Sequence, residues 1–403
     1  MKIEMKKKKL LLLGGSAQQI VAIEKAKSLG YDTVLCDYLP DNPGQRFADR
    51  FYLVSTTDRD AILQVANQEQ VDGVIAYASD PAAPTAAYVA EQLQLPTNPF
   101  WAVDILCNKG KFRKFLREHG FAVPMSLDVD NVQQAQGNLQ KFRFPIIIKP
   151  VDSSGSKGVT VLSTSEGVEQ AVRDALEFSR CGHVVLEEYV EKSHKYLIGG
   201  DLFVKDGRVC LWGLLNCHRD TRVNPLVPVG KSYPLQLEGQ DLEKVRETLQ
   251  RLIDLLEFRN GAMNVELIVD ARHQPYLIDV GPRNGGNMIP DLLDLIYGVD
   301  VIEASVQAAM GNPISMDPIP SGEIWATHNL HSRWDGNFEN IIFDSRLERY
   351  IVRKCIYKKP GDPVRYFDNA AKALGIIFMK FPTMGERDTI LGQIEDLYTI
   401  QLT

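Results

Sequence analysis

The first hundred residues alternate between short apolar runs and amphipathic segments, and this alternation constrains the fold more than any other feature. Leu10–Leu13 is an apolar run that ends in Gly14–Ser16, and Gln18–Leu29 then repeats apolar residues at helical spacing. The same strand–helix order recurs in the next segments. Strands that alternate with helices form parallel sheets, so the sequence predicts a Rossmann-like α/β domain here.

Ligands of such a sheet bind at the carboxyl ends of its strands. Gly14–Ser16, Asp37 and Ser79–Asp80 occupy those ends, so they are candidates for contacting a small substrate. Turn and cap chemistry explains the same residue types about equally well. The first loop lacks G-x-G-x-x-G, which argues against a dinucleotide site.

Length, composition and charge exclude several classes of protein. The 403 residues carry a net charge of -7 and are 44% hydrophobic, which indicates a soluble globular protein of two or three domains. The negative charge argues against a nucleic-acid-binding surface. We expect a cytoplasmic protein, because no apolar run is long enough to cross a membrane. His328 and His331 form an H-x-x-H without a nearby acid or cysteine pair, so we interpret them as surface or strand-end histidines rather than zinc ligands.

A loop of small residues follows the very apolar strand Pro145–Lys149. In this loop, VDSSGSKGV, Gly155 and Gly158 let backbone N–H groups approach phosphates closely, and Lys157 adds positive charge. A plain β-turn explains such a loop better when it is considered alone.

The segment 264–287, NVELIVDARHQPYLIDVGPRNGGN, predicts an antiparallel hairpin with two acids face to face. If the turn is centred between Arg272 and His273, Glu266 lies opposite Asp279. Opposed like charges destabilise a hairpin unless a cation lies between them, and Mg²⁺ is commonly held by one or two carboxylates and substrate phosphates. A solvated hairpin with its register off by one explains this segment about equally well.

Five motifs occur in order along the chain: IIIKP, SSGSKGV, LEEYV, NVELIVD and YLIDVGPRNGG. In this order they resemble the ATP-grasp superfamily, in the branch with biotin carboxylase, carbamoyl-phosphate synthetase, purine-pathway ligases and L-amino acid ligases. The resemblance implies a multidomain α/β and α+β fold. We expect a Rossmann-like pre-ATP-grasp domain at 1–105, an ATP-grasp domain at 106–312 with a mobile lid at about 120–187, and a small β-rich α+β domain at 313–403.

The resemblance also assigns roles to individual residues. Glu266 and Asp279 match the two acids that hold Mg²⁺, or Mn²⁺ in its place, and Arg283 matches the catalytic arginine that stabilises the transferred phosphoryl group. Lys149 is matched both to catalysis and to ATP. The full set matched to ATP is Lys109, Lys149, Gly155, Ser156, Lys157, Gly158, Glu187, Glu188, Tyr189, Val190 and His194. Within it, Glu187 and the backbone around Glu188–Val190 are matched to an adenine hinge.

The chain departs from the family pattern at two positions. His194 stands where an acid usually binds the ribose, and Gly281 stands where an asparagine often adds a metal ligand. Either one metal is held less tightly, or Asn284 substitutes.

The implied reaction is attack of a substrate carboxylate on the γ-phosphate of ATP, followed by capture of the acyl phosphate by an amine. We therefore expect small-molecule carboxylate and amine partners, no nucleic acid and no membrane, and a homodimer. The candidate substrate contacts are Arg219, Arg222, Asn284, Asn287 and Asp80. The two arginines are included because guanidinium groups match carboxylate geometry. Solvated loop arginines explain Arg219 and Arg222 equally well.

Three other functions stay open at this stage. The second hypothesis is a bicarbonate-activating carboxylase or an enzyme like carbamoyl-phosphate synthetase. The third is a non-catalytic ATP-binding protein, and a Rossmann-type dehydrogenase comes last because its fingerprint is missing.

Overall fold

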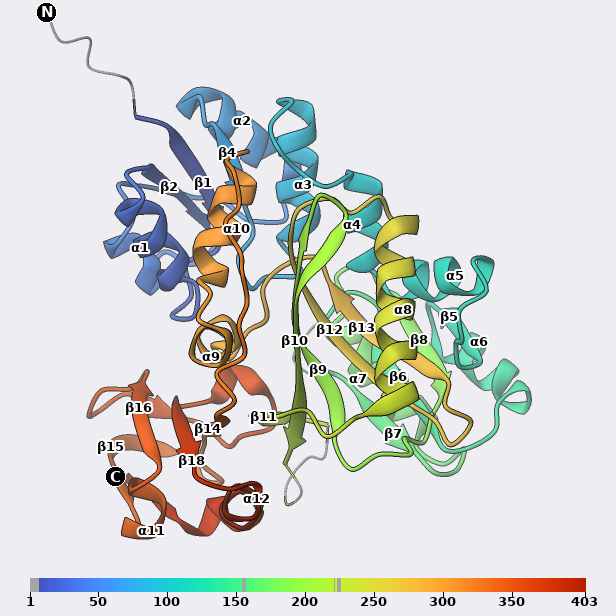
Figure 1. The fold of residues 1–403 in the computed structure, drawn as a ribbon. Coiled ribbons are helices and arrows are strands. Elements are labelled where there is room, and N and C mark those ends of the chain that lie inside the picture. Colours follow the sequence, from blue (N-terminus) through green and yellow to red (C-terminus); the bar gives the residue numbers. More distant parts are fainter. Residues whose placement is uncertain (1–6, 154–156, 221, 223–225) are drawn as a thin grey trace, which may run out of the picture.

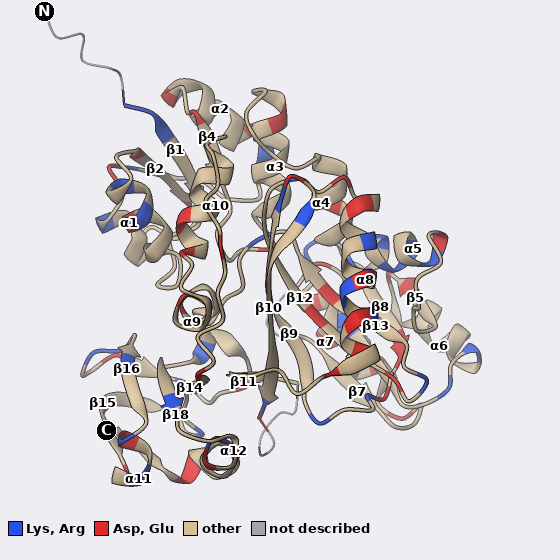
Figure 2. Cartoon of the chain, in the orientation of Figure 1, with Lys and Arg blue, Asp and Glu red and all other residues tan. Residues whose placement is uncertain are grey.

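The computed structural model describes residues 7–153, 157–220, 222 and 226–403. Within these ranges the strands form four sheets, which helices cover (Figure 1). The predicted multidomain α/β and α+β fold is therefore confirmed. Each helix in these ranges is too short or too polar to cross a lipid bilayer. Acidic and basic residues are spread over most elements in the view of Figure 2.

The amino-terminal part is a parallel sheet in the order β3-β2-β1-β4, as the strand–helix alternation predicts. Its elements are β1 (Lys9–Leu13), α1 (Ile20–Ser28), β2 (Asp32–Asp37), β3 (Arg50–Leu53), α2 (Arg59–Glu69), β4 (Gly73–Ile75), α3 (Ala83–Gln92) and α4 (Phe100–Leu106). Leu11 and Leu13 pack in the cluster with α2 and α3, whereas Leu10 and Leu12 pack with α1 and the later helix α10 (Val301–Ala309). Both faces of β1 are covered, which explains its unbroken apolar run.

A second, antiparallel sheet has the order β5-β8-β6-β7 and corresponds to most of the predicted lid. We refer to these four strands as the lid sheet. Its elements, with the helix that precedes them, are α5 (Lys109–Glu118), β5 (Ser126–Val129), α6 (Val132–Asn138), β6 (Ile146–Pro150), β7 (Thr160–Leu162), α7 (Val168–Glu177) and β8 (Val184–Glu188). Ile146 and Ile148 are fully buried in the cluster with α6 and α7. Because side chains alternate along a strand, Ile147 and Lys149 face the opposite way.

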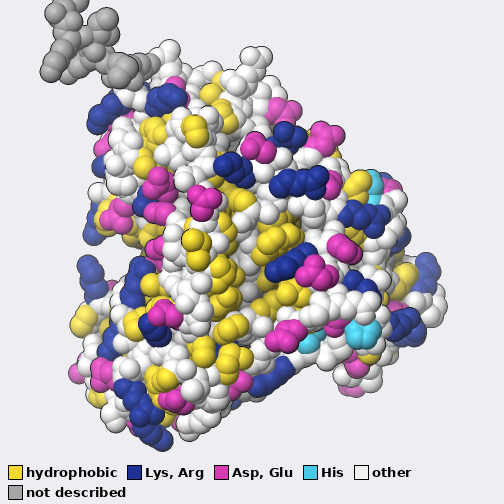
Figure 3. Space-filling model, viewed as in Figure 1, with side chains coloured by type: hydrophobic (Ala, Val, Ile, Leu, Met, Phe, Trp, Pro, Cys, Tyr) yellow, Lys and Arg dark blue, Asp and Glu magenta, His cyan; other side chains and the backbone are white. Residues whose placement is uncertain are grey.

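The largest sheet has eight strands in the order β13-β12-β9-β10-β11-β14-β18-β16. Its middle elements are β9 (Leu197–Lys205), β10 (Arg208–Arg219), β11 (Pro228–Tyr233), α8 (Gly239–Leu255), β12 (Gly261–Val269), β13 (Pro275–Gly281) and α9 (Ile289–Tyr297). Val265, Leu267 and Val269 of β12 pack in the cluster with α8, so Glu266 points to the other face. Figure 3 shows hydrophobic side chains gathered over the middle of the face in view.

The carboxyl-terminal segment continues this eight-stranded sheet through β14, β18 and β16, and its remaining strands form a small sheet in the order β17-β15-β19. Its elements are β14 (Ile324–Leu330), β15 (Gly336–Phe343), α11 (Ser345–Glu348), β16 (Ile351–Ile356), β17 (Pro363–Val364), β18 (Gly375–Phe381), α12 (Met384–Gly392) and β19 (Tyr398–Leu402). One sheet thus crosses the predicted boundary at residue 313. The domain boundaries stay predictions.

The two histidines of the H-x-x-H lie at the end of β14. His328 is within the strand and His331 directly follows it, so the strand-end interpretation is confirmed. The surface interpretation is wrong, because the two residues are only 2% and 4% exposed. His331 stacks on Phe367, with ring centroids 4.2 Å apart, and is thus buried within the carboxyl-terminal segment.

Candidate active site

A cavity of about 1610 Å³ is lined by residues of the parallel sheet, the lid sheet and the eight-stranded sheet. The amino-terminal part contributes Ser16, Asp37 and Asp80, which follow the carboxyl ends of β1, β2 and β4. The lid sheet contributes Ile147 and Lys149. The cavity therefore lies at the edge where a parallel sheet generally binds its ligands.

The two acids of the predicted hairpin face each other in this cavity. Glu266 on β12 pairs in register with Asp279 on β13, as expected. The assumed turn is wrong, however, because the register shifts after Glu266 and Val269 lies opposite Pro275. A β-bulge at Ile278 absorbs the extra residue and brings the acids back into opposition.

Each of these acids has a cationic neighbour. Lys109 Nζ lies 3.5 Å from Asp279 Oδ2, and Arg219 Nη2 lies 2.8 Å from Glu266 Oε2. Burial acts to raise the pKa of the Asp279 carboxyl, but Lys109 and the other nearby cations outweigh it and lower that pKa. Asp279 is thus ionised, as a metal-binding carboxylate must be.

The donor set at this point fits Mg²⁺ bound together with a nucleotide. Within the described ranges, no group of three or more His, Cys, Asp or Glu side chains is arranged to hold a metal ion. Two carboxylates on adjacent strands, with phosphates and water as the remaining ligands, are typical of Mg²⁺ in nucleotide enzymes. Glu266 and Asp279 are the residues that could hold it.

The ion pair between Arg283 and Asp80 occupies the space beside Gly281. A Cβ added to Gly281 would lie 2.4 Å from Asp80 Oδ1 and 3.0 Å from Arg283 Cζ, so a side chain at this position would displace that pair. Asn284, the proposed substitute, is 2% exposed, and its Nδ2 has no hydrogen-bond partner among the described residues.

A buried ion cluster connects helix α5 with the lid sheet. Glu187 Oε2 lies 2.6 Å from Lys149 Nζ, and Glu187 Oε1 accepts a hydrogen bond of 2.6 Å from Arg113 Nε. Burial acts to raise the pKa of Glu187, but Arg113 and Lys149 lower it to about 2. Arg113 also donates to the carbonyl of Ile278 at 2.7 Å. This cluster ties Lys149 to the bulge beside Asp279.

Arg113 was not among the predicted site residues. It lies on the buried face of α5 with Phe112, Phe115 and Leu116, and its side chain is 1% exposed. An arginine at an apolar position of an amphipathic helix is the sequence signal that could have identified it, because buried arginines are paired.

Arg283 lies close to the acid pair and forms an ion pair with Asp80 from the amino-terminal part. Its Nε has no hydrogen-bond partner among the described residues. The turn that carries it is anchored by Asp201, which the sequence analysis missed. Asp201 is fully buried, and its carboxylate accepts hydrogen bonds from Gly285 N at 2.7 Å and Asn264 Nδ2 at 2.8 Å.

The predicted phosphate loop is described only in part, since Gly155 and Ser156 lie outside the described residues. Lys157 lines the cavity. Gly158 has φ +68°, and a Cβ added there would come within 2.8 Å of the Phe178 ring, so the backbone requires glycine.

The predicted adenine hinge also lies at the cavity. Glu188, Tyr189 and Val190 line it, together with a group of apolar side chains suited to a flat ring: Pro124, Ile147, Leu197, Ile268 and Ile278. The amide of Glu188 donates to Met125 O and that of Tyr189 to Pro145 O, each at 2.9 Å. These two amides are thus occupied within the protein.

His194 is not among the residues that line the cavity. Its Nε2 accepts a hydrogen bond of 3.0 Å from Val269 N, and its Nδ1 lies 2.5 Å from Tyr196 O. Burial lowers the pKa of its imidazole, which favours the neutral ring that this pattern needs. His194 therefore fastens the segment before β9 to β12, and its ribose role stays a prediction.

Of the candidate substrate residues, Asp80, Arg219, Arg222 and Asn287 line the cavity, and Asn284 does not. Arg222 reaches the carboxyl-terminal segment, where it pairs with Asp396 at 2.7 Å, whereas Arg219 pairs with Glu266. Asn287 lines the cavity at φ +56°, and its backbone N donates to Gln18 Oε1 at 2.7 Å. The side chains of Arg219 and Arg222 thus do not form one clamp in this structure.

Comparison with known proteins identifies the family. The model of the carbamoyl-phosphate synthase L chain, ATP binding domain, matches residues 108–316. The carbamoyl phosphate synthase large chain of Thermotoga petrophila is 23% identical over 258 residues, which are 63% of this chain and 23% of that protein. The chain therefore spans about a quarter of the length of these relatives.

Two other proteins match nearly the whole chain. The formate-dependent phosphoribosylglycinamide formyltransferase of Sulfurisphaera tokodaii is 25% identical over 88% of this chain and 89% of that protein. The crystal structure of the L-amino acid ligase from Bacillus licheniformis superposes with a TM-score of 0.80 at 19% identity, over 99% of this chain and 100% of that one. The chain belongs to the family of the carbamoyl-phosphate synthase L chain ATP-binding domain, within the ATP-grasp ligases, which use ATP and Mg²⁺.

Proposed function

We propose that the chain is an ADP-forming ligase that joins a small carboxylate to an amine through an acyl phosphate. The observation that carries this proposal is the opposition of Glu266 and Asp279 in a cavity that Lys109, Lys149 and Arg283 also reach. Acids that can hold a cation thus lie beside cations that can hold phosphates. This combination suits phosphoryl transfer, in which positioning and charge stabilisation do most of the work.

Each charged residue has a distinct role in the proposed site. Glu266 and Asp279 hold Mg²⁺, which when bound offsets the negative charge of the β- and γ-phosphates. Lys109 and Lys149 bind phosphate oxygens, and Arg283 stabilises the charge that develops on the transferred group. The segment Glu188–Val190 and its apolar neighbours hold the adenine, while Lys157 adds positive charge for the phosphates.

The reaction has two steps with balanced bonds. A carboxylate oxygen of the substrate attacks the γ-phosphorus, and the bond to the β,γ-bridging oxygen breaks, so ADP leaves. The amine nitrogen then attacks the acyl carbon and the carbon–oxygen bond to phosphate breaks. The amine loses one proton, and an amide and inorganic phosphate remain. Exclusion of water from the cavity protects the acyl phosphate between the steps.

The second candidate reaction is activation of bicarbonate. The relatives named carbamoyl phosphate synthase large chain favour it, although the chain spans only 23% of their length. Bicarbonate would then take the place of the substrate carboxylate over the same acid pair.

A homodimer and a cytoplasmic location stay predictions.

The test is release of ADP and phosphate by the full chain with a panel of carboxylates and amines. A ligase releases ADP only when Mg²⁺, a carboxylate and an amine are all present, and EDTA stops the release. Release that depends on bicarbonate without an amine favours the second reaction. ATP binding without release under any combination contradicts both reactions and identifies a non-catalytic ATP-binding protein.

A further inference from the structure

One buried cation of the cavity differs from its neighbours because it has no acidic partner among the described residues. Lys231 on β11 is 5% exposed and lines the cavity. No carboxylate oxygen of the described residues lies within 4.0 Å of its Nζ, whereas Lys149, Arg219 and Arg283 each pair with an acid. A buried charge is costly unless a counter-charge compensates it. Lys231 therefore offers its charge to an anion in the cavity.

The side chain that touches Lys231 does not supply this counter-charge. Lys231 Nζ donates to Cys217 Sγ at 2.7 Å, on the adjacent strand β10. Cys217 is 2% exposed, and a cysteine sulfur is only a weak hydrogen-bond acceptor. The ammonium of Lys231 therefore has no carboxylate in direct contact among the described residues.

Lys231 and the acid pair project from the same face of the eight-stranded sheet. Lys231 lies opposite Cys217, and Glu266 lies opposite Gly199 on β9. A Cβ added to Gly199 would lie 2.7 Å from Cys217 Sγ and 3.4 Å from Glu266 Cγ. The side chains of Cys217 and Glu266 therefore approach each other over the glycine. Together with Lys231 they form a continuous strip of the cavity floor.

This strip has the dimensions of a small molecule. Strands β9 and β10 separate β11 from β12, and Lys231 and Glu266 are offset by two residues along the strands, so their backbones lie roughly 16 Å apart. Both side chains reach into the cavity and shorten this span. Thr327 on β14 pairs with Lys231 and also lines the cavity, so its hydroxyl offers a donor beside the ammonium.

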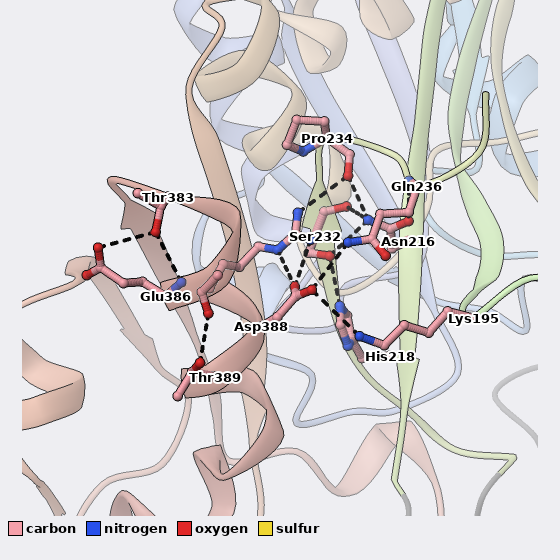
Figure 4. Close-up of polar contacts among 12 residues, drawn as sticks. Lys195, Asn216, His218, Ser232, Pro234, Gln236, Thr383, Glu386, Asp388 and Thr389 are labelled. Atoms are coloured by element: carbon pink, nitrogen blue, oxygen red, sulfur yellow. Dashed lines mark hydrogen bonds and ion pairs between the residues drawn. The ribbon is translucent and has the colours of Figure 1, made fainter. Parts of the chain in front are cut away.

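A hydrogen-bond network holds the backbone of Lys231 from the opposite face. Ser232, the next residue, bonds through its hydroxyl to His218 Nε2 at 2.8 Å and to Asn216 Nδ2 at 3.1 Å (Figure 4). Figure 4 also shows Lys195 directed toward Asp388, and these side chains lie 3.6 Å apart. Lys195 also lines the cavity but is largely exposed and has an acidic partner, so it is the control for a cavity lysine whose charge is paired.

We propose that Lys231 binds an oxyanion, a carboxylate or a phosphate group, which the carboxylate substrate carries in addition to the carboxylate that is activated. This inference rests on the proposed function of the same site. It specifies the substrate class as a small molecule with two anionic groups, one over Glu266 and Asp279 and the other at β11.

The test measures equilibrium binding of three probes to the full chain loaded with Mg²⁺ and ADP. Glutarate carries two carboxylates, 3-phosphonopropionate carries a carboxylate and a phosphonate, and pentanoate lacks the second anionic group. We expect at least one of the two dianions to bind tighter than pentanoate by on the order of tenfold to a hundredfold. If 3-phosphonopropionate binds tighter than glutarate, the group at Lys231 is a phosphate; if glutarate binds tighter, it is a carboxylate. Equal binding of all three probes to the wild-type chain overturns the proposal.

Variants then locate this selectivity. Lys231→Met should remove the preference for the dianion and leave pentanoate and ADP binding unchanged, whereas Lys231→Arg and the control Lys195→Met should retain it. A Lys231→Met chain that still prefers the dianion overturns the proposal. If Lys231→Met does not fold, Lys231→Gln takes its place with the same two outcomes. No turnover is needed, so failure of the ligase reaction would be seen separately, as absent ADP release.

Discussion

The two ends of the cavity differ in how their charges are balanced. At the acid pair, Lys109 faces Asp279, Arg219 faces Glu266, and Lys149 shares Glu187 with Arg113. At β11, the Nζ of Lys231 contacts the sulfur of Cys217 and no carboxylate of the described residues, and burial holds His218 in its uncharged form. The first end is electrostatically complete within the protein, and the second is not.

This difference separates two ways of preparing a site. Paired charges at the acid end hold their side chains in place in the free protein, and under the proposed function they would exchange partners with phosphates and Mg²⁺. An unpaired charge costs stability in the free protein and is compensated only by a ligand. Removal of a paired residue should therefore damage both fold and catalysis, whereas removal of Lys231 should affect only ligand binding.

The largest expected effect tests the acid pair. Glu266→Ala and Asp279→Ala should each lower Mg²⁺-dependent ADP release about a thousandfold or more, because the cation that offsets the phosphate charge loses a ligand. Coupled-assay rates of the purified variants measure this loss. Glu243→Ala on the exposed face of α8 is the control and should retain full activity. Undiminished release in both acid variants would sink the metal assignment.

The next largest effect tests the buried ion cluster. Glu187→Gln should lower the free energy of unfolding by about 3–5 kcal/mol, because Lys149 and Arg113 are left as uncompensated buried charges. Urea unfolding followed by circular dichroism measures it. Lys231→Met should be neutral or stabilising in the same assay, since it removes a charge that has no acidic partner. If both variants lose the same free energy, the contrast between the two ends is wrong.

A smaller effect tests Arg283. Arg283→Ala should lower turnover about a hundredfold and leave ATP affinity within a few-fold, because its proposed contact strengthens only as charge develops in the transition state. Steady-state rates and nucleotide titrations separate the two quantities. Arg346→Ala, at an exposed arginine of the carboxyl-terminal segment, serves as the control and should change neither quantity. Weakened ATP binding with unchanged turnover would refute the proposed role.

The smallest effect is a pH dependence at the β11 end. Burial lowers the pKa of His218 to about 4, so the folded protein keeps this ring neutral while the unfolded chain protonates near pH 6.5. The unfolded state gains protons below that pH, so the free energy of unfolding should fall by about 1–2 kcal/mol between pH 7 and pH 5. His218→Gln should reduce this slope in urea unfolding series. His328, whose pKa burial also lowers, should account for a part that remains.

The sequence predicted the elements and the acid pair well because both depend on local patterns. Apolar periodicity located β1, β2 and the helices between them, and alternation placed Glu266 and Asp279 on one face. The assumed turn was wrong, yet the bulge at Ile278 restored the pairing. The bulged residue Ile278 accepts a hydrogen bond from Arg113, which is distant in the sequence. The local alternation of apolar residues therefore does not predict the position of the bulge.

Side-chain partnerships across long sequence separations could not be predicted in this way. Glu187 was matched to adenine, but its carboxylate pairs with Arg113 and Lys149 from two other elements. Asp201 and Lys231 were missed, although Lys231 is the one charged residue of β11 and Asp201 lies among apolar and small residues in the middle of β9. That pattern signals a buried charge, but only the fold shows that Asp201 has partners and Lys231 has no acid.

The continuous eight-stranded sheet has a consequence for any attempt to shorten the chain. β11 pairs on one side with β10 and on the other with β14, which the carboxyl-terminal segment provides. A chain that ends at residue 312 would leave the backbone donors and acceptors of β11 open to solvent. Open strand edges recruit strands from other molecules, so such a fragment should aggregate even though it retains every residue of the acid pair. By pairing with β11, the carboxyl-terminal segment thus prevents self-association through that strand edge.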